Sequence, residues 1–177
     1  MMKIETQNNA ELIHLGKLIE NISVAMFTTL DDKGALVSRP MSPLQMDETG
    51  ALWFSIDIKS AKLENLRLIN LSFADISRST FVSLSGYGEV TTDRTKIDEL
   101  WTPFLRPWFP QGPDSPNLGL LKFLADTGEY WDAAHSKMIQ MFTMAASIIA
   151  ANPIGMGEHE TLTNLALIHR HKNHHVQ

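Results

Sequence analysis

The sequence predicts a mostly β protein with flanking helices, whose strands form a small antiparallel barrel. Several short runs rich in β-branched and aromatic residues are separated by turn-forming residues, as in antiparallel sheets. An amphipathic helical pattern precedes the first of these runs, and a second lies between two of them. The chain of 177 residues, 44% of them hydrophobic, can bury one sizeable core, so we expect a single domain over residues 1–177.

The first part of the chain reads as a helix followed by a hairpin. Residues 8–22 place leucines and isoleucines on one helical stripe, and Asn8 and Glu11 have the spacing of a capping box. We therefore expect the N-terminal helix within residues 1–22. Residues 23–30 and 35–41 are strand-like, and the intervening Asp-Asp-Lys-Gly supplies a turn, so these runs form a hairpin.

A third strand is expected at residues 51–57, after the turn signal Asp-Glu-Thr-Gly. Residues 60–69 then change to helical spacing and begin with Ser60, which is a suitable N-cap. Two further strands follow at 70–76 and 80–91, and glycines in the second of them indicate a bend or bulge.

The remaining chain begins with a capped helix over residues 93–101, followed by a loop stiffened by five prolines. A last strand pair is expected within residues 118–132, and a helical pattern follows from Ser136. The tail, residues 168–177, lacks an apolar period, so we expect it to be frayed.

Composition excludes several classes of function. The net charge of −5 argues against nucleic acid or an acidic membrane as the main partner. Because the chain has no cysteine, it has no disulfide, thiolate metal site or cysteine nucleophile, and redox chemistry would require a cofactor. The most apolar segment, residues 138–151, is too short and too polar to span a bilayer, and no signal peptide is evident. We expect a cytoplasmic protein.

Arg39 is a candidate phosphate ligand. Pro40 holds it in extended geometry at a break in the sheet, where freed backbone N–H groups beside a guanidinium suit an anion. Ser60 and Lys62 lie at the expected start of the next helix, whose unpaired N–H groups and dipole also favour an anion. Each residue also has a simpler alternative: Arg39 as an ion-paired surface arginine, Ser60 as an N-cap only, and Lys62 as a solvated lysine. Taken one residue at a time, each simpler role is commoner than phosphate binding.

A series of motifs over roughly residues 20–135 resembles one family. In order they are AMFTTLDDKGALVSRPM, LWFSID, SAK, FVSLSGYGEVTTDRTKIDELW, WFPQGPDSPNLGLLKF and GEYWD. These motifs resemble the general stress protein 26 branch of the pyridoxamine 5′-phosphate oxidase-like, FMN-binding split-barrel proteins. The resemblance implies a split β-barrel and a homodimer with FMN at the subunit interface.

The resemblance also implies roles for individual residues. Arg39 and Lys62 would face the FMN phosphate, and Ser60 would cap it. Pro40 and Met41 would lie under the flavin ring. Ser55 and Ile56 would run along the ring and the ribityl chain, and Trp131 would approach from the partner subunit. Relatives usually carry threonine where Ile56 stands, and the segment after Lys62 is shorter here.

Two other patterns have simpler alternatives. Histidines at 169, 171, 174 and 175 have spacings that suit a transition metal, but a polar tail is more often solvated, so no metal site is predicted. Residues 101–109, WTPFLRPWF, suit either a substrate-facing aromatic lid or core and dimer contacts, and we favour the second interpretation.

The predicted function is that of a flavoprotein oxidoreductase that passes electrons between bound FMN and a small molecule, with NAD(P)H as a candidate reductant. A non-catalytic FMN storage or sensor module is the main alternative. Pyridoxamine phosphate oxidase activity is less favoured, because no substrate-phosphate cluster is recognisable. A further alternative is a barrel that holds no cofactor and acts through contacts with other proteins.

Overall fold

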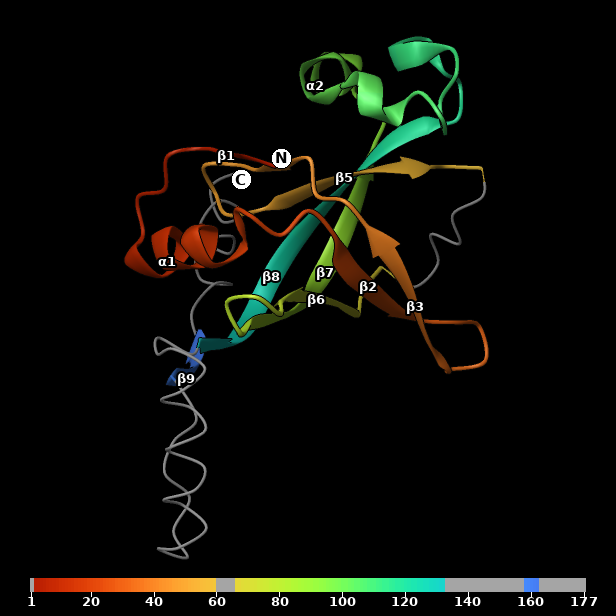
Figure 1. Ribbon diagram of the computed structural model, residues 1–177. Coiled ribbons are helices and arrows are strands. Elements are labelled where there is room, and N and C mark those ends of the chain that lie inside the picture. The colour runs from red at the N-terminus through yellow and green to blue at the C-terminus, as the bar shows by residue number, and fades with distance from the viewer. Residues whose placement is uncertain (1, 60–65, 133–157, 163–177) are drawn as a thin grey trace, which may run out of the picture.

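The computed structural model describes residues 2–59, 66–132 and 158–162, and these form a sheet with flanking helices (Figure 1). In chain order the elements are β1 (Lys3–Ile4), α1 (Ala10–Ile19), β2 (Ala25–Leu30), β3 (Leu36–Met41), β4 (Gln45–Met46), β5 (Leu52–Asp57), β6 (Ile69–Asp75), β7 (Thr80–Thr91), α2 (Arg94–Leu100), two 3-10 turns (Pro103–Leu105 and Gly112–Asp114), β8 (Leu118–Asp132) and β9 (Glu158–Leu162).

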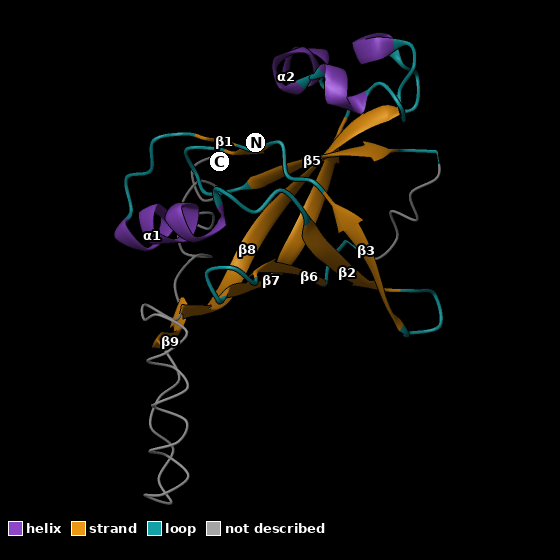
Figure 2. Ribbon diagram, viewed as in Figure 1, coloured by secondary structure: helices purple, strands orange, loops and turns teal. Residues whose placement is uncertain are grey.

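The strands follow the order β1-β4-β5-β8-β7-β6-β2-β3, and β9 pairs with β8. All pairings are antiparallel except that of β1 with β4, which is parallel. Figure 2 shows α1 at one side of the sheet and α2 with the 3-10 turns beyond one end. The predicted mostly β class is therefore confirmed, although the sheet is mixed and its described strands do not close into a barrel.

The helix α1 forms for the predicted reason but begins at a different cap. The side chain of Asn9, rather than that of Asn8, accepts hydrogen bonds from the N–H groups of Glu11 and Leu12, at 2.8 and 3.2 Å. The helix ends at Ile19, before the predicted boundary at residue 22. Its leucine stripe is buried, so α1 covers the edge of the main core.

The β7–β8 ribbon is the central feature of the sheet. The predicted bulge is present between Ser85 and Gly86, where Asp126 is the extra residue on β8. A Cβ atom on Gly86 would lie 2.0 Å from the carbonyl oxygen of Leu124, so only glycine fits this approach. The predicted strand pair at 118–132 is wrong, since this segment is one 15-residue strand.

Two segments that were predicted to be helical lie partly outside the described residues. Residues 60–65 lie outside the described part of the chain, but Ile69 already belongs to β6, so the predicted helix over 60–69 ends too late. Residues 133–157 and the histidine tail also lie outside it. The strand β9, at residues 158–162, was not predicted and corrects the expectation of helix throughout the region after Ser136.

Two apolar cores hold these elements together. The main core lies between α1 and the sheet, and Phe27, Phe54, Phe73 and Phe123 are among its largest fully buried side chains. A smaller second core joins α2 and the following loop to β5 and β8, and it contains Trp53, Ile97, Leu100, Leu105, Phe109, Leu118 and Leu120. Within the described residues, no helix has the length and apolar character that crossing a membrane requires.

Candidate functional site

A pocket of about 310 Å³ lies where the ends of β3 and β5 meet the loop after α2. Its lining residues are Pro40, Met41, Ser42, Ser55, Asp57, Phe104, Leu105, Trp108 and Phe109. The pocket therefore combines one wall from two strands with a second, largely aromatic wall from the loop after α2.

The strand β3 can carry the Arg39-Pro40 break because it is the last strand in the sheet order, with β2 as its neighbour. Proline is tolerated on such an edge, since no ladder partner requires its missing N–H. Arg39 is exposed, and its guanidinium carbon lies 5.1 Å from the centroid of the Phe27 ring. Within the described residues its side chain makes no hydrogen bond or ion pair, so the ion-paired alternative is not found there.

Strand alternation brings Arg39 close to the pocket. Side chains two positions apart on a strand share a face and lie about 7 Å apart, so Arg39 stands beside Met41, which lines the pocket. Arg39 itself does not line the pocket, but it lies on the strand that supplies Pro40 and Met41 to the wall.

The strand β5 supplies Ser55 and Asp57 to the pocket, while Ile56 between them faces the other way. The Ile56 side chain is buried in the main core. A flavin in this pocket would therefore meet the backbone of residue 56 rather than its side chain. Asp57 also accepts a hydrogen bond from the Lys59 N–H at 2.9 Å, which shapes the turn that leads toward Ser60.

Of the other predicted site residues, only Trp131 can be placed relative to this pocket. Ser60 and Lys62 lie outside the described residues. Trp131 is 41% exposed near the far end of β8, whereas Asp57 pairs with Leu118 at the beginning of that strand. At about 3.3 Å per residue, the two ends of the strand are on the order of 40 Å apart. Figure 1 shows β8 running from the end of the sheet near α2 to the end near β9.

The family follows from comparison with known proteins. Residues 10–154, which are most of the chain, match the model of the "Pyridoxamine 5'-phosphate oxidase like" proteins. The chain belongs to the pyridoxamine 5′-phosphate oxidase-like family. Its curated relatives include Protein bli-3 of Neurospora crassa, with 28% identity over 153 residues, which cover 78% of this chain and 73% of the relative.

Two solved structures are informative neighbours of this pyridoxamine 5′-phosphate oxidase-like chain. A putative general stress protein 26 from Jannaschia sp. CCS1 has a TM-score of 0.65 and 27% identity, and covers 88% of this chain and all of its own length (100%). The general stress FMN/FAD binding protein from Xanthomonas citri has a TM-score of 0.60 and 29% identity, with coverage of 72% and 93%. The predicted resemblance to general stress protein 26 is confirmed.

The aromatic loop of this family member divides into two kinds of side chain. Leu105 and Phe109 are buried in the second core, and Trp101 packs against it. Phe104 and Trp108 are instead 62% and 60% exposed. Phe104 and Trp108 are therefore not core residues of the single chain, and whether they make dimer contacts stays a prediction. Phe104, Leu105, Trp108 and Phe109 all line the pocket.

A polar network behind the second core was missed by sequence reasoning. Asp47 is buried and accepts hydrogen bonds from the N–H and hydroxyl of Thr49, the N–H of Ala51 and the indole N–H of Trp53, the last at 2.8 Å. Burial would raise the pKa of Asp47, but these hydrogen bonds outweigh it and lower the pKa. The amide of Gln7 also donates to the Asp47 carbonyl, at 2.7 Å.

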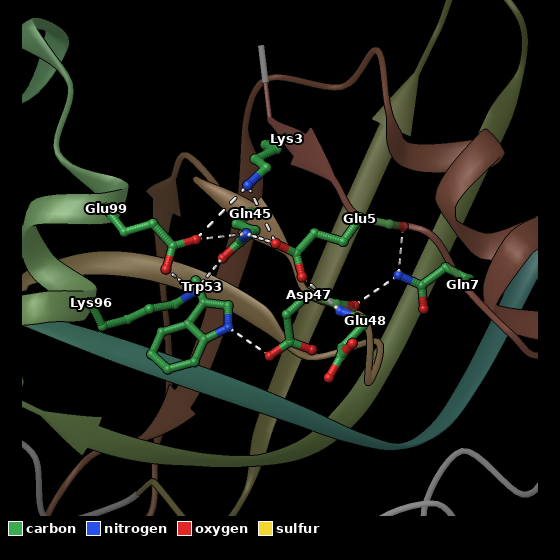
Figure 3. A network of polar contacts seen from close by, with 9 residues as sticks. All are labelled: Lys3, Glu5, Gln7, Gln45, Asp47, Glu48, Trp53, Lys96 and Glu99. Carbon is green, nitrogen blue, oxygen red and sulfur yellow. Dashed lines mark hydrogen bonds and ion pairs between the residues drawn. The ribbon is translucent and has the colours of Figure 1, made fainter.

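The network continues from Asp47 toward α2 through Gln45 (Figure 3). The fully buried Gln45 donates to Glu5 at 2.6 Å and accepts from Lys96 at 2.8 Å. Lys96 also contacts Glu99 at 2.9 Å, and this hydrogen bond lowers the pKa of Glu99. The Lys96 ammonium lies 5.0 Å from the Trp53 ring centroid. These contacts hold the second core, on which the aromatic wall of the pocket rests.

Proposed function

We propose that this protein is an FMN-binding oxidoreductase of the general stress protein 26 type, which passes electrons between its flavin and a small molecule. The observation that carries the proposal is the exposed Arg39, which lacks an ionic partner among the described residues and stands beside a pocket lined by Met41. A flavin needs flat apolar walls for its ring and a fixed cation for its phosphate. A relative described as FMN/FAD binding supports this reading.

In this proposal the strand β3 binds both parts of the cofactor. Arg39 and Lys62 hold the phosphate, Ser60 caps it, and Pro40 and Met41 support the ring. Ser55 and the backbone of Ile56 lie along the ring and the ribityl chain. FMN would supply the redox chemistry, and NAD(P)H is the candidate reductant, so the protein residues bind and orient the cofactor.

The proposed assembly is a homodimer in which Trp131 of one copy completes the site of the other. The pocket volume of about 310 Å³ is at the small end of the range for ligand sites, about 300–1,000 Å³, which suits a site that a second copy finishes. Exposed apolar side chains on the β2–β3 hairpin, including Leu36 at 75% and Val37 at 46%, favour burial against another copy.

Electron transfer can be tested by rapid mixing of the FMN-loaded protein with NADPH or NADH under anaerobic conditions. We expect the oxidised flavin band to bleach faster than that of free FMN, and to return when an oxidant is added. Bound FMN that exchanges electrons no faster than free FMN would instead identify a storage or sensor module.

Trp131→Ala should weaken FMN binding while leaving the thermal unfolding midpoint nearly unchanged, because the side chain is partly exposed at a strand end. A mixed dimer provides a sharper measurement. Arg39→Ala and Trp131→Ala chains with different affinity tags are co-expressed and purified through both tags.

Each mixed dimer then contains one intact site and one site that carries both substitutions. We expect it to bind about one FMN per dimer with wild-type affinity, although neither parent variant does so. Failure to recover a tight site, or a monomer mass for the wild type in light scattering, would contradict the shared site.

A further inference from the structure

The pocket has an aromatic wall that the proposed flavin site does not require. Phe104 and Trp108 are 62% and 60% exposed, whereas their neighbours Leu105 and Phe109 are 4% and 3% exposed. Exposed aromatic side chains of this size are costly in water and often mark a binding surface. We therefore expect Phe104 and Trp108 to contact a ligand or a partner protein.

The backbone that carries these two side chains is held firmly. The N–H groups of Trp108 and Phe109 both donate to the Leu105 carbonyl, at 3.1 and 3.0 Å. Leu105 and Phe109 are buried in the second core, which contains Trp53 from β5. The exposure of Phe104 and Trp108 is thus a consequence of a fixed local fold, in which the next residue in each case, Leu105 or Phe109, is buried in the second core.

The two exposed rings act as one surface. Their centroids are 5.6 Å apart with a tilt of 50°, which is a favourable geometry for an aromatic pair. Both rings line the pocket together with Pro40 and Met41 from β3. A flat molecule that enters the pocket would meet the aromatic pair on one side and the flavin-supporting strand on the other.

The charge of the pocket selects among flat molecules. Asp57 is the only charged residue among the described residues that line it. Arg39 does not line the pocket, so the Asp57 carboxylate disfavours an anionic group placed close to it and favours a cationic or neutral one there.

We propose that Phe104 and Trp108 form the substrate wall of the site and hold a flat, neutral or cationic aromatic molecule beside the flavin. This inference rests on the proposed flavin function and names the class of substrate for it. Aromatic stacking supplies the affinity, and Asp57 supplies the charge preference.

The test is calorimetric titration of the FMN-loaded protein with three probes of one shape: 2-naphthylmethylammonium, 2-naphthalenemethanol and 2-naphthoate. We expect the cation and the neutral alcohol to bind, and the anion to bind at least about tenfold more weakly. Phe104→Ala and Trp108→Ala should each weaken probe binding about tenfold, with FMN affinity retained. Asp57→Asn should remove most of the charge preference.

Ile13→Ala is the matched control, because Ile13 is 41% exposed on α1 and does not line the pocket. It should bind FMN and the probes as the wild type does. Trp108→Leu keeps an apolar side chain without the ring and should also lose probe affinity, which separates stacking from general apolarity. Unchanged probe affinity in Phe104→Ala and Trp108→Ala would overturn the proposal.

Two further outcomes would overturn it in different ways. If the same variants lose FMN as strongly as the probes, the aromatic pair belongs to the flavin site. If they lose the dimer mass in light scattering, the pair belongs to a subunit interface. If the wild type binds no FMN, the same titrations are made with FMN-free protein. Probe binding that depends on Trp108 would then support the proposed class of ligand. The absence of such binding would overturn the proposal.

Discussion

Asp47→Ala should lower the free energy of unfolding by about 3 kcal/mol, because it leaves buried hydrogen-bond donors without a partner. In the folded protein this carboxylate satisfies the indole N–H of Trp53 and the backbone N–H groups of Thr49 and Ala51. Each buried donor that loses its acceptor costs roughly 1–3 kcal/mol, and relaxation with entry of water reduces the sum. Urea unfolding of both proteins at pH 7 measures the effect.

The chain contains a matched control for this turn. Asp31 accepts hydrogen bonds from the N–H groups of Lys33 and Ala35, at 2.8 and 2.9 Å, in the same pattern but at the surface. Asp31→Ala should therefore cost less than about 1 kcal/mol, since water replaces the lost acceptor. Equal losses in the two variants would contradict a special role for the buried network.

The pH dependence of the Asp47 contribution has a defined sign. Because the folded state lowers the pKa of Asp47, the ionised carboxylate stabilises the fold at pH values above the ordinary aspartate pKa of about 3.9. That contribution is lost as the pH falls below about 4 and through the folded-state pKa. The stability difference between the wild type and Asp47→Asn should consequently be constant near neutral pH and decrease in acid.

Arg39→Ala should weaken FMN binding about tenfold to a hundredfold. A charge-assisted contact to a phosphate contributes roughly 1.5–3 kcal/mol, and each 1.4 kcal/mol is a factor of ten in affinity. Riboflavin lacks the phosphate, so its weaker binding should remain nearly unchanged in the variant. We expect the same pattern for Lys62→Ala. Titration calorimetry with both ligands measures the difference.

Lys17→Ala is the control for the loss of one positive charge. Lys17 lies in the last turn of α1 and does not line the pocket. It should bind FMN as the wild type does. If Arg39→Ala also binds FMN normally, or loses FMN and riboflavin equally, the phosphate role of Arg39 is wrong.

Local patterns in the sequence were sufficient for the elements whose structure is decided locally. The strand at residues 80–91 and the bulge near Gly86 were predicted because alternation and a glycine signal them directly. The helix α2 begins as expected, with the Asp93 side chain accepting from the Thr95 N–H. Family motifs then located Arg39 and Met41 at one end of a strand, where the pocket lies.

Features that depend on distant contacts could not be read from local patterns. Asp126 and Thr127 look like a turn within 118–132, but pairing with β7 keeps them in one strand, in which Asp126 is the bulged residue. The two-residue strands β1 and β4 are too short for a periodic signal. Asp47 was recognised as part of a turn, but its burial depends on Gln7 and Trp53.

The most direct test of the account is the absorption spectrum of the purified protein after incubation with excess FMN and gel filtration. The account predicts a yellow protein that retains the flavin bands at about one FMN per chain and elutes with the mass of a dimer. A folded, colourless protein that retains no FMN under these conditions would contradict the proposed flavin site.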